Sequence, residues 1–243
     1  MMENTKTEIV QKAYDLIGES KVKGFKYRDP ITGAEIRYFK EYKTLYIFVD
    51  ATNDLNDWIT NVGGALSYKI IHINGFAVKI HKGYSLASYN LTNHLLIEKP
   101  EIFNNIEQIF VSGYSMGGGI SPCMTLELYR NMPNFNYIGV GMEGTTYCRF
   151  PKKFELPENV KIINVINGND TVTKVWFWFK KIGQIIHIGE KRKWWKIGIA
   201  KYNPIRTDKE GFLKQRFHIP DHHYGEFKKS LREWKKLNEQ KRI

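Results

Sequence analysis

Apolar positions along the chain recur with two periods, one typical of helices and one typical of buried strands. Between residues 7 and 20 they fall at helical spacing, and Gly18 lies near the end of the run, so a helix is predicted there. The same pattern predicts helices at 54–62, 84–99 and 224–239. A further helix is predicted after the glycine-rich turn that follows residue 112, and it extends to about Arg130. Short apolar runs predict strands at 36–50, 75–80, 108–112, 137–140 and 160–166.

The alternation of strands and helices predicts an α/β fold built around a largely parallel central sheet flanked by helices. The stretch from 175 to about 201 alternates aromatic and basic residues, which predicts a C-terminal aromatic hairpin. The chain contains neither an internal repeat nor an obvious linker, so we expect residues 1–243 to form one domain.

Composition excludes several classes of protein. Apolar residues make up 42% of the chain and aromatic residues 14%, which is enough for a sizeable core and excludes a disordered, collagen-like or small disulfide-stapled chain. No apolar run is long enough for a spanning helix, and residues 1–6 lack the apolar core of a secretion signal, so we expect a cytoplasmic protein. Cys123 and Cys148 form no disulfide framework.

The formal net charge of +12 has two interpretations. It could mark a basic face for an anionic membrane surface, or for nucleic acid as the less favoured partner. It could equally reflect a general enrichment in lysine. The aromatic and basic residues at 176–181 and 191–196 suit contact with lipid, but a hairpin with one packed face and one solvated face would carry the same pattern.

The clearest chemical signal is Gly113-x-Ser115-x-Gly117, placed directly between a predicted strand and a predicted helix. So tight a turn holds its central residue at strained backbone angles, and glycine on either side removes the clash between the flanking positions. Ser115 would then stand above the sheet at a helix N-terminus, where the backbone N–H of Met116 could face an oxyanion. The alternative is a glycine-rich turn with a buried serine.

A serine nucleophile requires a base, and α/β-hydrolases supply the acid and then the histidine later in the chain. Asp170 follows the predicted strand 160–166, where an orienting acid belongs, although a turn aspartate would also suit that loop. His222 and His223 precede the final predicted helix and offer the base. The remaining candidate histidines are His72, His81, His187 and His218, of which the first two precede the serine and so fit the order badly.

The sequence resembles the class 3 lipase family, the fungal-lipase-like branch of the α/β-hydrolases, over about residues 36–227. Six short blocks in the family's order carry the resemblance. They are Ile47-Phe48-Val49-Asp50-Ala51-Thr52 with Asp57-Trp58, His81-Lys82-Gly83-Tyr84, the turn at Ser115, Asn169-Asp170-Thr171-Val172, His187-Ile188-Gly189-Glu190, and Asp221-His222.

The resemblance implies Ser115 as the nucleophile, Asp170 as the orienting acid and His222 as the base, with His223 as the alternative base. It also implies that Thr52 and Met116 form the oxyanion hole. The family carries an arginine-glycine pair where this chain has Asp50-Ala51, and we expect the Asp50 carboxylate to point away from an oxyanion.

In fungal members of the family, the segment after the oxyanion residue is a lid. Leu55, Trp58 and Ile59, with Val62 on the same face, would here close the site or contact an acyl chain. The alternative is that these side chains pack on the core.

Together, these signals predict a serine hydrolase that cleaves carboxylic esters, and they favour a lipase acting on triacylglycerol or phospholipid. The mechanism uses an acyl-enzyme and requires neither a metal nor an organic cofactor. Two other functions stay open. One is a thioesterase or peptidase that uses the same triad. The other is a catalytically decayed or non-lipid hydrolase scaffold that acts as a cationic lipid- or nucleic-acid-binding protein.

Overall fold

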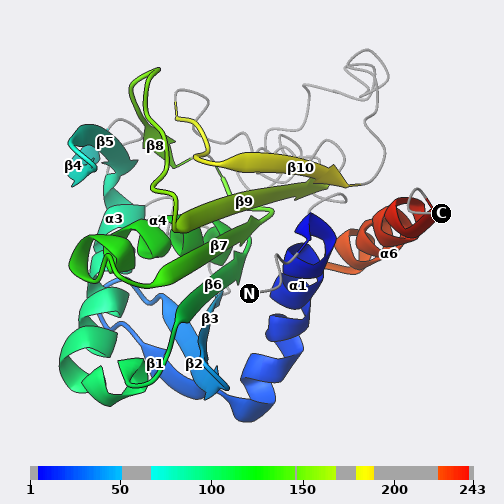
Figure 1. Cartoon of the computed structure of the whole chain (residues 1–243), viewed down its shortest axis with the longest axis horizontal. Helices are drawn as coiled ribbons and strands as arrows, with labels where there is room; N and C mark the ends of the chain where they lie inside the picture. Colours follow the sequence, from blue (N-terminus) through cyan, green and yellow to red (C-terminus); the bar gives the residue numbers. More distant parts are fainter. Residues whose placement is uncertain (1–4, 51–66, 146, 168–178, 189–223, 241–243) are drawn as a thin grey trace, which may run out of the picture.

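A central sheet organises the protein in the computed structural model, which describes residues 5–50, 67–145, 147–167, 179–188 and 224–240 (Figure 1). In spatial order its strands are β1 (Phe25–Arg28), β2 (Glu35–Glu41), β3 (Thr44–Asp50), β6 (Gln108–Tyr114), β7 (Asn136–Met142), β9 (Val160–Asn167) and β10 (Gln184–Ile188). The first three strands pair antiparallel, and every pairing from β3 to β10 is parallel. The predicted α/β class with a mainly parallel sheet is therefore confirmed.

Two helices cover one face of the sheet. The apolar side of α1 (Lys6–Lys23) buries Ile9, Val10, Ala13 and Leu16 against the sheet, in a cluster that also contains Phe227 and Leu231 of α6 (Tyr224–Gln240). At the start of α1 the Thr5 hydroxyl accepts the Glu8 N–H while the Glu8 carboxylate accepts the Thr5 N–H, a capping box that satisfies backbone donors of the first turn.

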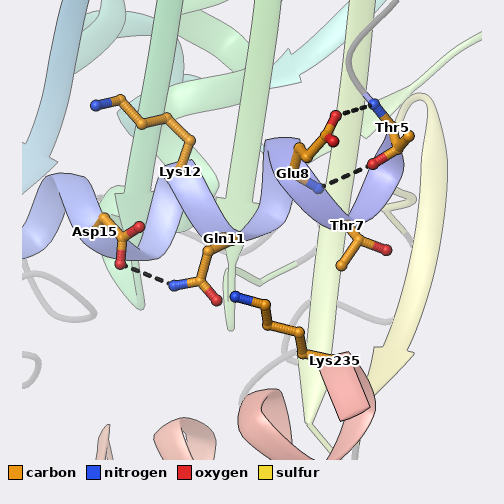
Figure 2. Close-up of a pocket in the computed structure, with 7 residues that line it drawn as sticks. All are labelled: Thr5, Thr7, Glu8, Gln11, Lys12, Asp15 and Lys235. Atoms are coloured by element: carbon orange, nitrogen blue, oxygen red, sulfur yellow. Dashed lines mark hydrogen bonds between the residues drawn. The ribbon is translucent and has the colours of Figure 1, made fainter. Parts of the chain in front are cut away.

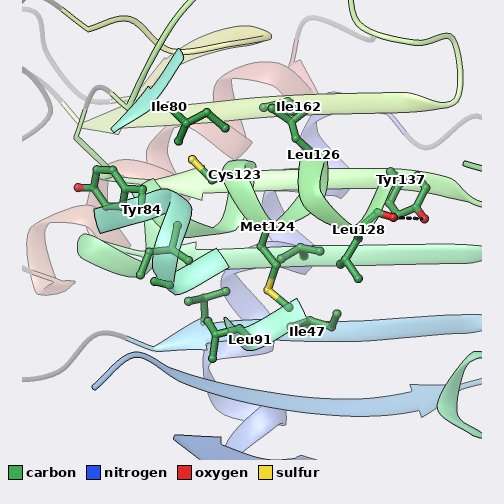
Figure 3. Close-up of a cluster of buried hydrophobic side chains, with 14 of the residues drawn as sticks. Ile47, Ile80, Tyr84, Leu91, Cys123, Met124, Leu126, Leu128, Tyr137 and Ile162 are labelled. Carbon is green, nitrogen blue, oxygen red and sulfur yellow. Dashed lines mark hydrogen bonds between the residues drawn. The ribbon is translucent and has the colours of Figure 1, made fainter. Parts of the chain in front are cut away.

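The opposite face is covered by α4 (Met116–Asn131), which packs on β6 and β7, and α3 (Lys82–Asn93) packs on α4. Figure 3 shows their side chains meeting those of the strands in the larger of two apolar clusters. Every residue of α4 from Met116 to Leu128 is buried, so this part of the helix is enclosed on all sides.

A second sheet of three strands lies beside α3. It consists of β4 (Tyr68–Ile73), β5 (Phe76–His81) and β8 (Cys148–Arg149), all antiparallel. A π-helical turn, η1 (His94–Glu98), and a 3₁₀ turn, η2 (Pro100–Phe103), lead from α3 towards β6. None of the helices in the described ranges is long and apolar enough to cross a bilayer.

Most predicted elements are present with shifted bounds. The run predicted at 36–50 is the hairpin β2–β3, and the helix predicted at 84–99 ends as α3 at Asn93 and continues as η1. The predicted C-terminal hairpin is not confirmed. Residues 184–188 form β10, a parallel edge strand next to β9, and Lys180 forms an isolated antiparallel bridge with Cys148. The other parts of the predicted hairpin, 175–178 and 189–201, lie outside the described residues. The single domain stays a prediction.

Candidate active site

Ser115 stands at the junction of β6 and α4 in the backbone conformation that a nucleophile turn requires. Its φ of 57° and ψ of −118° are strained values for a residue with a side chain. The Ser115 N–H donates to the Met142 carbonyl at the end of β7, at 2.9 Å, which anchors the turn to the neighbouring strand. Ser115 is half-buried and caps α4, and the helix begins at Met116, whose N–H belongs to the first turn. The predicted strand–turn–helix geometry is confirmed.

The two glycines of the motif are required by close approaches of the backbone. A methyl group on Gly113 would collide with the Gly117 carbonyl group, as the crowding argument predicts. A methyl group on Gly117 would instead collide with the Val49 carbonyl at the end of β3. The turn therefore packs on itself at Gly113 and on the end of β3 at Gly117, without space for a Cβ at either position.

The parallel register brings the candidate segments to one edge of the sheet. Val49 pairs with Gly113, Gly113 with Gly141, and Gly141 with Asn164, so β3, β6, β7 and β9 all end near the Ser115 turn. In the sequence, Thr52 follows the end of β3 by two residues and Asp170 follows the end of β9 by three. The carboxyl edge of a parallel sheet is where α/β enzymes assemble their sites.

The start of α6 also lies beside the turn. The Phe227 ring is fully buried and meets the Tyr114 ring edge-to-face, with centroids 5.6 Å apart. Tyr114 directly precedes Ser115, and His222 lies five residues before Phe227 in the sequence. The contact therefore places the start of α6, which follows His222 and His223 in the sequence, next to the Ser115 turn.

The Asp50 carboxylate, at the end of β3, pairs with a side chain of β2, the neighbour of β3 on the side away from β6. Its Oδ2 lies 3.2 Å from the guanidinium of Arg37 on β2, and Arg37 also donates to Glu35 at 2.9 Å. Since β3 separates β2 from β6 in the sheet, Arg37 draws this acidic group away from the strand that carries Ser115. This agrees with the expected orientation of Asp50.

Two of the rival histidines are poor candidates for the base on geometric grounds. His81 is fully buried between the Tyr84 and Phe179 rings, and burial lowers its pKa to about 4. His72 is exposed on β4, in the second sheet and not in the central sheet that ends at Ser115. The histidine of β10, His187, is exposed on the outermost strand.

Two buried charged residues at the site edge were missed from the sequence. Glu143 follows β7, and its carboxylate accepts the Asn167 N–H at 2.5 Å. The Lys181 ammonium donates to the carbonyls of Gly144 and Thr145. A single acid between apolar residues and glycine, directly after a buried strand, is the signal that could have revealed Glu143.

The other predicted site residues lie outside the described part of the chain. These are the oxyanion residue, the lid or acyl-contact candidates, the acid and both candidate bases: Thr52, Leu55, Trp58, Ile59, Asp170, His222 and His223. Their roles stay predictions. Within the described ranges, no group of three His, Cys, Asp or Glu side chains lies together in a way that could hold a metal ion.

A pocket of about 280 Å³ lies between α1 and α6 (Figure 2). It is lined by the polar side chains Thr5, Thr7, Glu8, Gln11, Lys12, Asp15 and Lys235. The carboxylates in it are engaged within α1, since Glu8 caps Thr5 and Asp15 accepts from Gln11 at 2.8 Å. The pocket includes none of the predicted site residues, so we do not assign the chemistry to it.

Comparisons with known proteins agree with this geometry. A family model described as Lipase (class 3) matches residues 46–180, more than half of the chain. No curated protein sequence matches the chain.

Solved structures of lipases share the fold. A triacylglycerol lipase from Penicillium expansum is 13% identical, with a TM-score of 0.53, and the match covers 75% of this chain and 79% of that one. The lipase of Rhizomucor miehei in its propeptide complex is 17% identical, with a TM-score of 0.52 and coverage of 76% and 70%. A triacylglycerol lipase described as having a serine protease triad is 16% identical, with a TM-score of 0.55 and coverage of 76% and 82%. At these identities the likeness establishes the α/β-hydrolase fold.

Proposed function

We propose that this chain, which belongs to the class 3 lipase family, is a lipase that hydrolyses triacylglycerol or phospholipid esters through a triad of Ser115, His222 and Asp170. Family membership makes it a carboxylic ester hydrolase. The observation that carries the proposal is the backbone of Ser115, held at positive φ between β6 and the N-terminus of α4. One of the structurally similar triacylglycerol lipases has a serine protease triad as its catalytic centre, which supports the triad here by analogy.

In the proposed mechanism the Ser115 hydroxyl attacks the ester carbonyl while His222 takes its proton. The oxyanion accepts the backbone N–H groups of Met116 and Thr52. His222 then protonates the leaving alcohol, and water releases the acyl group by the same base. Asp170 holds the imidazole in the required tautomer and stabilises its charged form.

The contact of Tyr114 with Phe227 supports a base located just before α6, because the first turn of α6 packs on the residue that precedes Ser115. His222 is preferred over His223 on the Asp-His block of the family. Thr52 is supported by the register, since β3 ends beside Gly113.

We also propose that the protein contacts anionic membrane surfaces peripherally. The exposed basic side chains of α6, which include Lys228, Lys229 and Arg232, and the net charge of +12 support this part of the proposal. The cytoplasmic location stays a prediction.

The triad is tested by labelling with a fluorophosphonate probe and by hydrolysis of a short-chain p-nitrophenyl ester. Ser115→Ala is expected to fold normally, lose all labelling and lower kcat by on the order of 10⁶, because the triad acts as a unit. His222→Ala should lose activity similarly, whereas His223→Ala, its matched control, should retain most of it.

Either of two results would contradict the proposal. One is ester hydrolysis by Ser115→Ala close to that of the wild type. The other is a folded wild-type protein that stays unlabelled even with detergent or anionic vesicles present, which would favour a decayed scaffold that binds lipid or nucleic acid. A preference for thioesters or peptides would keep the triad and reject the lipase assignment.

A further inference from the structure

Glu143 is a fully buried acid at the carboxyl edge of the central sheet. It lies one residue beyond β7 with a φ of 53°, a conformation that costs free energy for a residue with a side chain. Its backbone N–H donates to the Val165 carbonyl of β9 at 2.9 Å. The strained backbone is therefore held in place from the neighbouring strand.

The side chain of Glu143 makes a second connection to β9. Its Oε1 accepts the N–H of Asn167, the last residue of β9, at 2.5 Å. A carboxylate makes a shorter and stronger hydrogen bond to a backbone N–H than a neutral acceptor does. Together, the two bonds fix the end of β9 against the end of β7.

The same strand end also holds the nucleophile. The Met142 carbonyl, one residue before Glu143, accepts the Ser115 N–H. Two consecutive residues therefore hold the serine turn on one side and the end of β9 on the other. Asn167 precedes Asp170 by three residues in the sequence.

Lys181 secures the residues that follow Glu143. Its buried ammonium donates to the carbonyls of Gly144 and Thr145, and Thr145 is hydrogen-bonded in turn to the Tyr84 hydroxyl of α3. Glu143 is thus held by β9, and the two residues that follow it are held by Lys181.

We propose that Glu143 is a positioning residue for ester hydrolysis: its carboxylate fixes the carboxyl end of β9 relative to the Ser115 turn. This inference rests on the function proposed above. An apolar side chain of similar volume would fill the same space without the cost of burying a carboxylate, so burial alone does not account for an acid here.

The experiment compares Glu143→Gln with Glu143→Leu in the full-length enzyme, with Glu127→Gln and Glu127→Leu as matched controls. Glu127 is also a nearly buried acid, but it pairs with Arg130 at 2.7 Å near the far end of α4. The measurements are kcat and KM for a soluble p-nitrophenyl ester, the pH profile of kcat/KM, and thermal unfolding. Fluorophosphonate labelling of the wild type comes first, since its absence would remove the proposed function rather than the role of Glu143.

Glu143→Leu is expected to lower kcat by about 10- to 100-fold with KM unchanged, because the end of β9 loses its anchor. Glu143→Gln keeps an oxygen that accepts the Asn167 N–H, so its kcat should stay within about threefold of wild type, with the acidic limb of the pH profile in place. The Glu127 variants should retain kcat. If Glu143→Leu does not fold, Glu143→Asp withdraws the acceptor while keeping the charge, and the same loss of kcat is expected.

Two outcomes overturn the proposal. If Glu143→Leu unfolds at lower temperature but its labelled, folded fraction keeps the wild-type kcat, Glu143 serves stability alone. If Glu143→Gln loses as much activity as Glu143→Leu and its acidic limb moves to lower pH, the negative charge acts on the catalytic base directly. Removal of a nearby negative charge lowers the pKa of a histidine, which gives that shift its sign.

Discussion

At the scale of single residues, the candidate site combines strained backbone at Ser115 and Glu143 with the buried carboxyl group of Glu143. Ser115 and Glu143 both have positive φ, and each directly follows the end of one of two adjacent strands, which the Ser115–Met142 hydrogen bond links. Strained residues persist where the surrounding structure fixes them, and they concentrate at functional sites. Here the surrounding structure consists of two glycine contacts, two strand ends and a buried helix.

His81 provides a prediction about acid stability. Burial lowers its pKa to about 4 in the folded protein, from an ordinary value of 6.5, so between these values the unfolded chain binds a proton that the folded chain does not. The free energy of unfolding should therefore fall as the pH drops from about 6.5 to about 4, by at most about 1.4 kcal/mol per pH unit from this group. Above 6.5 the residue makes no pH-dependent contribution.

The measurement is urea unfolding at several pH values between 7 and 4 for wild type, His81→Phe and His72→Asn. His81→Phe should lose part of the pH slope, whatever its stability at pH 7, while the exposed His72 serves as the control. An unchanged slope in His81→Phe would show that the ring is not kept neutral by burial.

At the scale of elements, helices and strands with long apolar patterns could be predicted from the sequence, whereas short or partly exposed strands could not. The helix near residues 7–20 and the strands that become β6, β7 and β9 have continuous apolar patterns, and all are present. By contrast, β4 has three exposed residues at its start and β8 has two residues in all, so neither carries a pattern that stands out locally. Their pairing depends on tertiary contacts.

The features of the candidate site also include some that could be predicted from the sequence and some that could not. The turn at Ser115 was predictable because its motif lies between a strand pattern and a helix pattern and the need for Gly113 is local, although Gly117 is required by Val49 of the distant strand β3. Glu143 was not, because its role depends on Asn167, which reaches it only once β7 and β9 pair. The contact of Tyr114 with Phe227 likewise joins distant parts of the chain.

Phe227 is predicted to be the anchor of α6. Its ring is fully buried between Tyr14 of α1 and Tyr114, so Phe227→Ala should lower the free energy of unfolding by about 3–5 kcal/mol. Activity should fall with it, because the helix follows the proposed base. Denaturant unfolding measures the effect, with Leu237→Ala as the control, since Leu237 is 58% exposed and should change stability by about 0.5 kcal/mol or less. Equal effects of the two variants would show that α6 is not held through Phe227.

At the scale of the whole molecule, the excess of positive charge predicts salt-sensitive binding to anionic vesicles. Affinity for phosphatidylserine vesicles should fall steeply between roughly 50 and 500 mM NaCl, and phosphatidylcholine vesicles should bind weakly at either concentration. Lys228→Glu combined with Arg232→Glu, both exposed on α6, should cost about 2 kcal/mol of binding free energy. Vesicle flotation or sedimentation measures this, and equal binding to neutral vesicles, or binding to DNA alone, would contradict the membrane proposal.

The central position of β6 has a consequence for how the chain folds. On one side its partner is β7, the next strand along the chain, but on the other side Thr44 of β3 must find Gln108 across the segment that forms β4, β5 and α3. Parallel pairings between such distant segments form slowly, because a long loop must close before any contact stabilises it. The Gly117 backbone meets β3 and the Ser115 N–H meets β7, so the Ser115 turn is complete only after both pairings exist. Recovery of serine reactivity during refolding should therefore lag behind the recovery of helical structure.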